Sequence, residues 1–434
     1  MMLRAGAARV SISPRPEDFR EGVYLGGFGA YRQRRASGVR DEPQCRAAVL
    51  SDGEQAVAIA ALDLVGASGP LLARVRDGAA KRTGIAPERV LIACTHSHAS
   101  PDTQGLWGGV PRAYEAHVAA RAIAAIGEAH AALRDARASA ATTQLGGLVR
   151  NRRGWPETDT ALTTLRLADS SGATIGTIVN YACHPTASGA ANTEVSRDWC
   201  GVAADAVEAA LGGVAIYING AIGDVNPARD GVPAMVQLGE AVAQAAVASL
   251  DAADDVTGPV VVNTAPLLLP LQLERLSERV QAAVVRVLPG ISLADRAGAL
   301  HAVALALHKA GRADVAQLVA ALAGMGERRI ERRDGRSYVA THCGYLRIGG
   351  VEAYCAPGEI LTRLGLPLRA SLGGRHRMLF GLTHDTLGYF VPEDEWMSGR
   401  NNNYEEGVSM GRRAAAALDA ALRALAPRAE EAAP

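Results

Sequence analysis

The stretch Val90-Leu91-Ile92-Ala93-Cys94-Thr95-His96-Ser97-His98 is a short apolar run that ends in polar residues and two histidines. An apolar run of this length with β-branched residues is typical of a buried strand. Residues two apart in an extended segment face the same way, so His96 and His98 can point into one pocket. Imidazole is the commonest protein metal ligand, but it also forms ordinary hydrogen bonds in loops. The pair alone fits both readings equally well.

Three other apolar runs in the first half also lead directly into polar residues: Ala56–Ala61 before Asp63, Thr177–Ala182 before His184, and Val214–Ile218 before Asn219. Segments with helical periodicity lie around these runs: Pro70–Arg82, Ala113–Leu133, Trp199–Leu211 and Gly239–Leu250. This alternation predicts an α/β fold with a central mixed, largely parallel sheet flanked by helices. Ligands gather at the carboxyl ends of strands in such sheets, where all of these polar residues are expected.

The composition and the predicted secondary structure change in the second half of the chain. Residues 270–335 are largely rich in Ala and Leu with arginines at helical spacing, which predicts a helical insertion. Strand character returns afterwards, with a hairpin over Tyr345–Ile348 and Glu352–Cys355, a strand over Arg377–Leu382 and a closing helix over Tyr404–Leu425. We therefore expect one catalytic domain over residues 1–425, followed by a disordered tail over residues 426–434.

Composition excludes several classes of partner. The chain has 45 basic and 45 acidic side chains, so it lacks the one-signed field of a nucleic-acid-binding protein. No apolar run has the length of a signal peptide or a membrane span, so we expect a cytoplasmic protein without integral membrane association. The six cysteines show no paired spacing and are expected to remain thiols. The sequence does not determine the oligomeric state.

Several other residues could join the two histidines. His184 ends another predicted strand, and two histidines brought to one crevice are easier to explain by a shared metal than by packing, since buried imidazoles need partners. The loop Asn219–Pro227 presents Asp224 and Asn226, either to a substrate or in an ordinary turn. Arg152 could stabilise an oxyanion or belong to solvated surface. Glu359 is either a helix-start charge or a carboxylate ligand, and Tyr389 either a core or a site residue.

These motifs, taken in order, resemble the catalytic N-terminal domain of neutral/alkaline non-lysosomal ceramidases, which are zinc amidases. The THxH block and the GDVxP block are the most specific, and the others gain weight from their order. The matching blocks are Gly26-Gly27-Phe28-Gly29, Asp63, Cys94-Thr95-His96-Ser97-His98-Ala99-Ser100-Pro101, Asn151-Arg152, His184, Gly223-Asp224-Val225-Asn226-Pro227, Pro357-Gly358-Glu359, Tyr389 and Tyr404-Glu405-Glu406-Gly407.

The resemblance implies a site of two parts. It implies a Zn²⁺ ion held by His96, His184, Glu359 and Tyr389, with one position left for water or substrate. It also implies that His98 and Arg152 line the reacting carbonyl, where the developing negative charge would be stabilised. A metal-activated water would then cleave an amide without a covalent intermediate. We include Asp224 and Asn226 among the candidate catalytic residues because of their place in the loop.

Two departures from the family pattern change the expected substrate. Asn226 stands where the family has a serine, often proposed as its nucleophile, and asparagine is not such a nucleophile. The chain also stops soon after Gly407, without the family's C-terminal β-sandwich domain. We therefore expect a hydrolase of a small soluble amide and not of ceramide at a membrane.

Three alternatives remain open. An ester or lactone hydrolase would use the same site, because the activated water attacks either carbonyl. A non-catalytic metal-binding or ligand-sensing protein would keep the metal site without turnover. A cysteine hydrolase would use Cys94, Cys183 or Cys200 beside a histidine.

Overall fold

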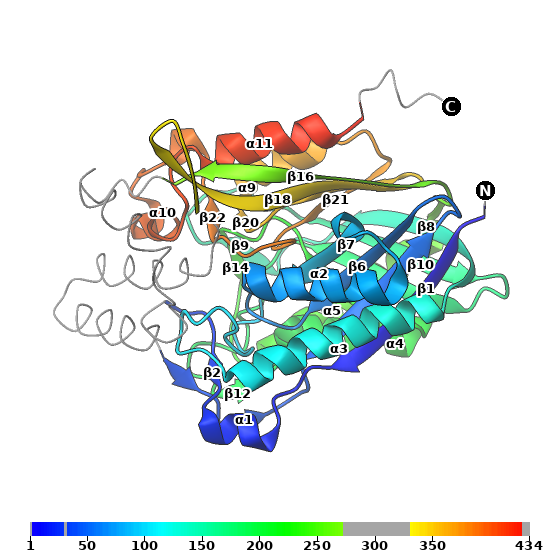
Figure 1. Cartoon of the computed structure of the whole chain (residues 1–434), viewed down its shortest axis with the longest axis horizontal. Helices are drawn as coiled ribbons and strands as arrows, with labels where there is room; N and C mark the ends of the chain where they lie inside the picture. Colours follow the sequence, from blue (N-terminus) through cyan, green and yellow to red (C-terminus); the bar gives the residue numbers. More distant parts are fainter. Residues whose placement is uncertain (1, 30–32, 272–329, 428–434) are drawn as a thin grey trace.

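The computed structural model describes residues 2–29, 33–271 and 330–427 (Figure 1). Its largest sheet has the strand order β13-β11-β10-β8-β1-β5-β6-β7, and β15 pairs with β8 at the side. The strands of this sheet are β1 (Arg4–Ser11), β5 (Gln44–Ser51), β6 (Ala56–Leu62), β7 (Val90–Cys94), β8 (Arg134–Gln144), β10 (Ala161–Asp169), β11 (Thr174–Tyr181), β13 (Val214–Asn219) and β15 (Asp254–Asp255). The four strands predicted in the first half are therefore β6, β7, β11 and β13, with ends within a few residues of the prediction.

The directions of these strands correct one prediction. The sheet is mixed, as expected, and helices flank it, but it is mostly antiparallel and "largely parallel" was wrong. Only β6–β7 and β11–β13 are parallel, and each pair is joined through a helix. The prediction rested on those four strands, because their strong apolar runs stand out. The strands β1, β5, β8 and β10 are rich in Ala, Arg and Thr, and they supply the antiparallel pairings.

The large sheet bends where β1 meets β8, since only two residue pairs, Arg4–Asp135 and Ala5–Arg134, join its two halves. The inner faces of both halves contribute to one buried core. Strand β6 shows the alternation that produces this arrangement: Val57, Ile59 and Ala61 belong to the inner core, whereas its intervening residues pack outward on helices. Each half of the sheet therefore buries both of its faces.

A second sheet, of strand order β16-β18-β19-β21 with β17 beside β18, adds its inner face to the same core. Its strands are β16 (Val260–Pro270), β17 (Ile330–Arg333), β18 (Arg336–Ile348), β19 (Val351–Cys355) and β21 (His376–Phe380). The predicted hairpin is confirmed as β18 and β19, which turn at Gly349 and Gly350. The strand predicted over Arg377–Leu382 is β21.

Helices cover the outer face of each layer. In Figure 1, α2 (Gly69–Thr83) and α3 (Arg112–Ala131) lie side by side over the β1–β7 half, and α11 (Ala414–Leu425) lies over β16 and β18. Helices α4 (Asp198–Leu211) and α5 (Val232–Ser249) cover the other half of the large sheet, and α9 (Thr362–Ala370) packs with α11. The shorter helices are α1 (Pro16–Glu21), α10 (Tyr404–Gly407) and the 3₁₀ turns Pro87–Arg89, Leu250–Ala252, Glu393–Glu395 and Arg400–Asn403.

The closing helix predicted over Tyr404–Leu425 is two helices. α10 ends at Gly407, and α11 starts at Ala414 after a break that contains Gly411 with φ +126°. A glycine adopts that backbone conformation without strain, and helical periodicity does not register such a break.

Most of the predicted insertion, residues 272–329, and nearly all of the predicted tail lie outside the described residues. At the ends of the insertion the structure has strands, since β16 runs to Pro270 and β17 covers Ile330–Arg333. No helix in the described part of the chain has both the length and the apolar character needed to cross a membrane.

Arg46 fastens the two halves of the large sheet together. Its buried guanidinium leaves β5 and donates to the carbonyl oxygen of Ala215 in β13 at 3.2 Å and to Asp205 in α4 at 3.0 Å. Glu208 of the same helix lies 3.7 Å away. The three contacts tie a strand of one half to a strand and a helix of the other.

We expect Arg46→Ala to lower the free energy of unfolding by about 3 kcal/mol, because it leaves a cavity and removes the buried bonds that join the two halves of the sheet. Urea denaturation would measure this loss. Arg166→Ala is the control, since Arg166 bonds only within its own hairpin, to Thr174 and Gly172, and should cost roughly 0.5 kcal/mol or less. Equal losses in the two variants would contradict the role given to Arg46.

Candidate metal centre

His96 follows the end of β7 in a fixed conformation. Its backbone N–H donates to the carbonyl oxygen of Leu64 at 2.9 Å, and its φ of +66° is rare for a residue with a side chain. Strained residues of this kind are typical of functional sites. The ring Nδ1 contacts the carbonyl oxygen of Val65. A carbonyl only accepts, so Nδ1 carries the proton and the lone pair is on Nε2.

His184 follows the end of β11 and is held in the same manner. Its backbone N–H donates to the carbonyl oxygen of Val225 at 2.9 Å, and its Nδ1 lies 3.3 Å from that oxygen. The indole N–H of Trp199 donates to the carbonyl oxygen of His184 at 3.1 Å. The lone pair of this fully buried ring is therefore also on Nε2.

Asn219 brings the ends of β7 and β13 together, although these strands are the two edges of the large sheet. Its side-chain amide donates to the carbonyl oxygens of Cys94 at 3.0 Å and Thr95 at 2.8 Å. The bend of the sheet and this bridge bring the histidine-bearing loops to one place. The polar residues at the strand ends thus lie together, as predicted. The bend of a mixed sheet brings them together, and not the shared edge of a parallel sheet.

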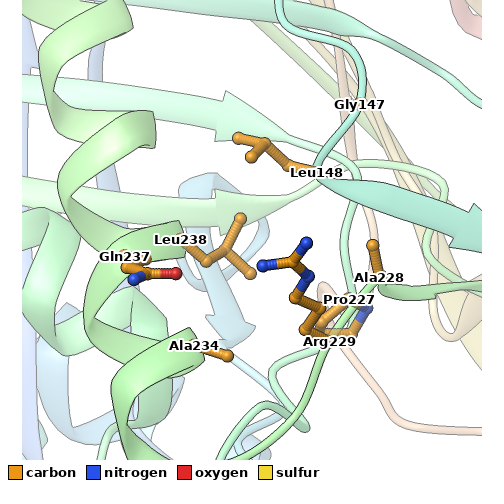
Figure 2. A pocket seen from close by; sticks show the side chains of 8 residues that line it. All are labelled: Gly147, Leu148, Pro227, Ala228, Arg229, Ala234, Gln237 and Leu238. Carbon is orange, nitrogen blue, oxygen red and sulfur yellow. The ribbon is translucent and has the colours of Figure 1, made fainter.

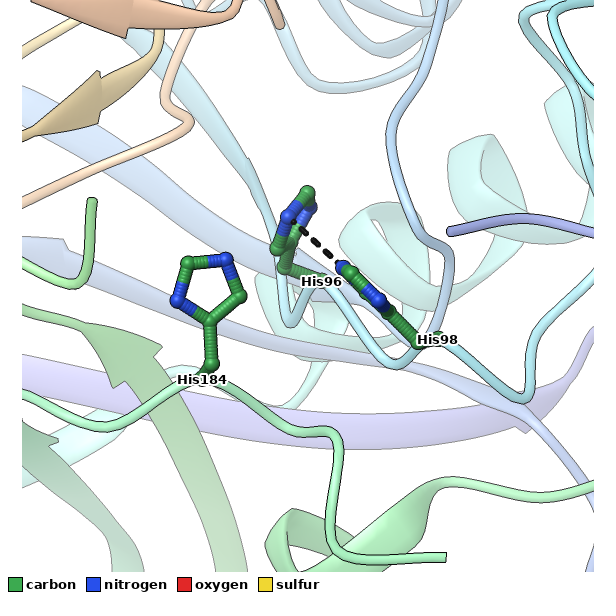
Figure 3. Close-up of side chains that lie close together, drawn as sticks. All are labelled: His96, His98 and His184. Atoms are coloured by element: carbon green, nitrogen blue, oxygen red, sulfur yellow. Dashed lines mark hydrogen bonds between the residues drawn. The ribbon is translucent and has the colours of Figure 1, made fainter. Parts of the chain in front are cut away.

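Three histidines form one buried group (Figure 3). Ligand atoms of His96, His98 and His184 all lie within 4.8 Å of one another, and this is the one group of its kind within residues 2–29, 33–271 and 330–427. His98 Nε2 lies 3.2 Å from His96 Nε2, while His98 Nδ1 is buried without a hydrogen-bond partner. The geometry is that of a group able to hold a metal ion.

Glu359 completes this group from the other side. It lies in the two-residue strand β20 (Glu359–Ile360), before α9 and not in its first turn. One carboxylate oxygen is 3.5 Å from His96 Nε2 and the other is 2.9 Å from His184 Nε2. Yet neither His184 Nε2 nor Glu359 Oε2 has a hydrogen-bond partner among the described residues. Two imidazole lone pairs that face a buried carboxylate repel it, unless a cation lies between them.

The protonation states fit a metal site. Burial lowers the pKa of His184 to about 4, with Arg152 nearby contributing in the same direction. Burial also lowers the pKa of His98 well below its usual value. Burial opposes ionisation of Glu359, but the adjacent His96 and His184 hold the pKa of its carboxyl well below the usual value. At neutral pH His98 and His184 are therefore neutral imidazoles and Glu359 is an ionised carboxylate, which are the forms that bind metals.

Tyr389 stands beside Glu359. It lies in β22 (Tyr389–Phe390), which pairs in parallel with β20 so that Tyr389 and Glu359 are in register. Burial raises the pKa of the Tyr389 phenol well above its usual value, although Arg152 acts in the opposite direction. The Arg152 guanidinium lies 5.2 Å from the Tyr389 ring centre. Tyr389 is thus at the site, and its service as a ligand stays a prediction.

Arg152 directly follows the short strand β9 (Val149–Asn151), and Asn226 lies in β14 (Val225–Pro227), which pairs with β9. Arg152 Nη2 donates to the carbonyl oxygen of Gly223 at 2.6 Å, and Nη1 donates to Asn226 Oδ1 at 3.4 Å. Asn226 is half-buried, so its amide is not sealed inside the core. The guanidinium belongs to the site and not to solvated surface.

The carboxylate of Asp224 is hydrogen-bonded within the protein, unlike the free carboxylate expected of a catalytic group. It is fully buried, and both of its oxygens are occupied. Oδ1 accepts from the backbone and hydroxyl of Thr362, and Oδ2 accepts from Asn151. These bonds tie the segments that carry Glu359 and Arg152 to the Asn226 loop. The contacts give Asp224 a positioning role.

The glycine block near the N-terminus packs directly on the histidines. A Cβ on Gly26 would lie 2.3 Å from Val65, the residue that fixes His96, and a Cβ on Gly27 would lie 2.2 Å from the His98 ring. Gly27 also has φ +86°. The sequence reading matched this block to a family without giving it a role, because a requirement for close approach is visible only in three dimensions.

Sequence reasoning gave no role to Arg153 or to the two glutamates at 405 and 406. The side chain of Arg153 is fully buried and bonds to both glutamates. The only sequence signals for this ion-pair cluster were the pair of glutamates in one matched block and the pair of arginines in another. Their partnership across some 250 residues was not readable from spacing.

The cysteines offer no nucleophile. All six are buried free thiols. Burial raises the pKa of Cys94 to about 12 and that of Cys183 and Cys200 well above the usual value. A reactive cysteine needs a low pKa and access, so the structure speaks against the cysteine-hydrolase alternative.

A pocket of ≈ 290 Å³ lies next to the Asn226 loop. Figure 2 shows the Arg229 side chain reaching into it between Leu148 and the α5 residue Leu238. The pocket begins at Pro227, one residue after Asn226, and none of the clustered histidines lines it.

Comparison with known proteins places this fold and site. Residues 20–248 match the family "Neutral/alkaline non-lysosomal ceramidase, N-terminal". The crystal structure of neutral ceramidase from Pseudomonas aeruginosa is similar with a TM-score of 0.74 and 18% identity, over 98% of this chain and 74% of that one. A structure described as ceramidase complexed with C2 is similar with a TM-score of 0.73 and 16% identity, over 98% and 75%. No curated protein sequence matches the chain.

The fold and the site define an α/β protein with a buried histidine group that could hold a metal ion. The chain belongs to the neutral/alkaline non-lysosomal ceramidase family, a family of hydrolases. The resemblance seen in the ordered motifs is thereby confirmed.

Proposed function

We propose that this protein is a zinc-dependent hydrolase that cleaves an amide bond of a small soluble substrate. One observation carries the proposal. The Nε2 lone pairs of His96 and His184 face the two oxygens of the buried, ionised Glu359, with no hydrogen bond at the 2.9 Å contact. These groups repel one another when no ion is present. A divalent cation between them would bind to the two nitrogens and to the carboxylate, and so remove the repulsion.

His96, His184, Glu359 and Tyr389 would hold the ion. The Nδ1 contacts with the backbone carbonyls of Val65 and Val225 are the outer hydrogen bonds that fix a ligating histidine. A set of imidazole, carboxylate and phenol groups with an open position suits catalytic zinc better than a closed structural site. Bound zinc would supply an acidified water and polarise the substrate carbonyl.

The remaining residues would act on the carbonyl itself. His98 lies beside the place proposed for the ion, with its Nε2 3.2 Å from His96 Nε2, and Arg152 is held beside Asn226 with its Nη1 in a long contact of 3.4 Å. Both groups would stabilise negative charge that develops on the carbonyl oxygen. Asn226 would donate a hydrogen bond to the substrate from its side-chain amide.

Asn226 bears on the route of hydrolysis. Without a hydroxyl at this position a serine nucleophile is absent, so water would attack the carbonyl directly. Esters and lactones present the same carbonyl to the same groups, so an ester or lactone hydrolase is the second candidate.

The test combines metal analysis with a substrate panel. Purified protein is expected to contain about one zinc ion per chain, and to hydrolyse at least one of a panel of N-acyl amino acids, cyclic amides, esters and lactones. A chelator should remove the activity, and added zinc should restore it. Protein with no stoichiometric zinc, iron or manganese would refute the metal site. Stoichiometric metal with binding but no turnover would instead support the non-catalytic ligand-sensing alternative.

A further inference from the structure

Two adjacent arginines next to the site have divided roles. Arg153 is held through both of its terminal nitrogens: they donate to Glu405 at 2.9 Å, to both oxygens of Glu406 at 3.0 and 3.2 Å, and to the carbonyl oxygen of Glu395. Its side chain is 0% exposed. Arg152, in contrast, is 13% exposed and lies against Tyr389. Arg153 is thus locked in the core, while Arg152 borders the open part of the site.

Glu405 connects the two arginines. Its carboxylate has no exposed surface; Oε1 accepts from Arg152 Nε at 2.8 Å and Oε2 accepts from Arg153 Nη1 at 2.9 Å. Asn401 also donates to Oε1, at 2.7 Å. Because both oxygens of the Glu405 carboxylate are bonded, the carboxylate cannot rotate, and it fixes the direction in which the Arg152 side chain extends.

This bond controls where the guanidinium of Arg152 points. Because Glu405 takes the Nε edge, the two terminal nitrogens are turned toward the Asn226 loop, where Nη2 meets Gly223 and Nη1 has only a 3.4 Å contact. The guanidinium lies against the edge-to-face pair of rings of Tyr389 and Tyr404, 5.2 and 5.5 Å from their centres. The ring contacts limit its tilt, and Glu405 limits its rotation and reach.

We propose that Glu405 is a positioning residue that aims Arg152 at the reacting carbonyl, with Arg153 as the anchor that holds Glu405 in place. This inference rests on the proposed function for the reaction itself, but the placement of Arg152 can be tested without it. The short helix α10 near the C-terminal end thereby forms part of the working site.

The chain offers a matched control, because Glu406 is also a buried glutamate, but within the described part of the chain its carboxylate bonds only to Arg153. We expect Glu405→Gln to lower kcat by about 30-fold or more with little change in KM and with unchanged zinc content, whereas Glu406→Gln stays within about threefold of wild type. Glu405→Asp should recover part of the lost rate. In an Arg152→Ala background, Glu405→Gln should cost little further, since the two changes remove the same interaction.

A second measurement does not depend on turnover or on zinc. Binding of hexanoate to the metal-free protein, followed by calorimetry, reports whether Arg152 can receive a carboxylate, and Glu405→Gln should weaken it about tenfold while Glu406→Gln does not. The positioning role would be overturned if the two glutamine variants weakened hexanoate binding equally. It would also be overturned if Glu405→Gln lowered kcat in the Arg152→Ala background as much as it does in the wild type. A wild type that binds hexanoate through Arg152 but hydrolyses nothing would refute the proposed function and leave this inference standing.

Discussion

Changing His184 to alanine is expected to abolish zinc binding and to lower kcat/KM by roughly 10³-fold or more, the loss expected when a metal worth several kcal/mol to the transition state is removed. Among the proposed ligands, His184 gives the clearest test, because its ring is completely buried and its Nε2 lies 2.9 Å from Glu359. Alanine would leave Glu359 facing a cavity, with one nitrogen ligand fewer. Zinc content by elemental analysis and initial rates on the best substrate of the panel would measure both effects.

The control for this variant is His376→Ala. His376 is another buried histidine, but it bonds to Thr142 and Asp254 at 3.0 Å each, in the second sheet. Its loss should lower stability without lowering zinc content. Zinc bound only to the folded protein also stabilises it, so a chelator should lower Tm in His376→Ala and leave His184→Ala unchanged. Retention of a full equivalent of zinc by His184→Ala would refute the metal centre as proposed.

Changing His98 to alanine is expected to lower kcat by about 10²- to 10³-fold while zinc content stays near that of wild type. The reason is that His98 belongs to the histidine group but is absent from the Glu359 contacts, which involve His96 and His184. Its Nε2 lies 3.2 Å from His96 Nε2, so this ring borders the place proposed for the ion.

The comparison of His98→Ala with His96→Ala separates the two residues of the pair. His96→Ala should lose zinc and activity together, whereas His98→Ala should lose activity alone. If His98→Ala loses zinc to the same extent, His98 is a ligand and the division of labour between the two histidines is wrong. Differential binding of a hydroxamate to both variants, after zinc has been added back, gives a check that does not depend on turnover.

The strands that could be predicted were those with unbroken apolar runs. The prediction placed Val90–Cys94 at its observed bounds, and the strands before His184 and Asn219 were placed within three residues. Burial on both faces makes such strands apolar throughout, which is a local property of the sequence. The antiparallel strands β1, β5, β8 and β10 were missed because alanine, arginine and threonine fit strand and helix alike. The break between α10 and α11 was missed because periodicity continues across it.

The site was predictable to a similar degree. His96, His98, His184 and Glu359 do lie together, and the sequence indicated each of them through its place at a strand end or in a matched block. Asp224 was expected to be catalytic, whereas its oxygens are taken up by Thr362 and Asn151. Whether a polar side chain is free or already bonded depends on partners from elsewhere in the chain, and no spacing rule contains that information.

The sequence by itself determined the parts of this protein that depend on neighbours along the chain. These are the buried strands, the helices between them, the polar residues where strands end and the ordered blocks that mark the family. Tertiary structure alone decided what those residues do. The bend between β1 and β8 and the Asn219 bridge brought the edges of the sheet together, and Glu405 met Arg152 and Arg153 across more than 250 residues. Local periodicity records which face of an element is buried, but contacts between distant segments arise only when the chain has folded.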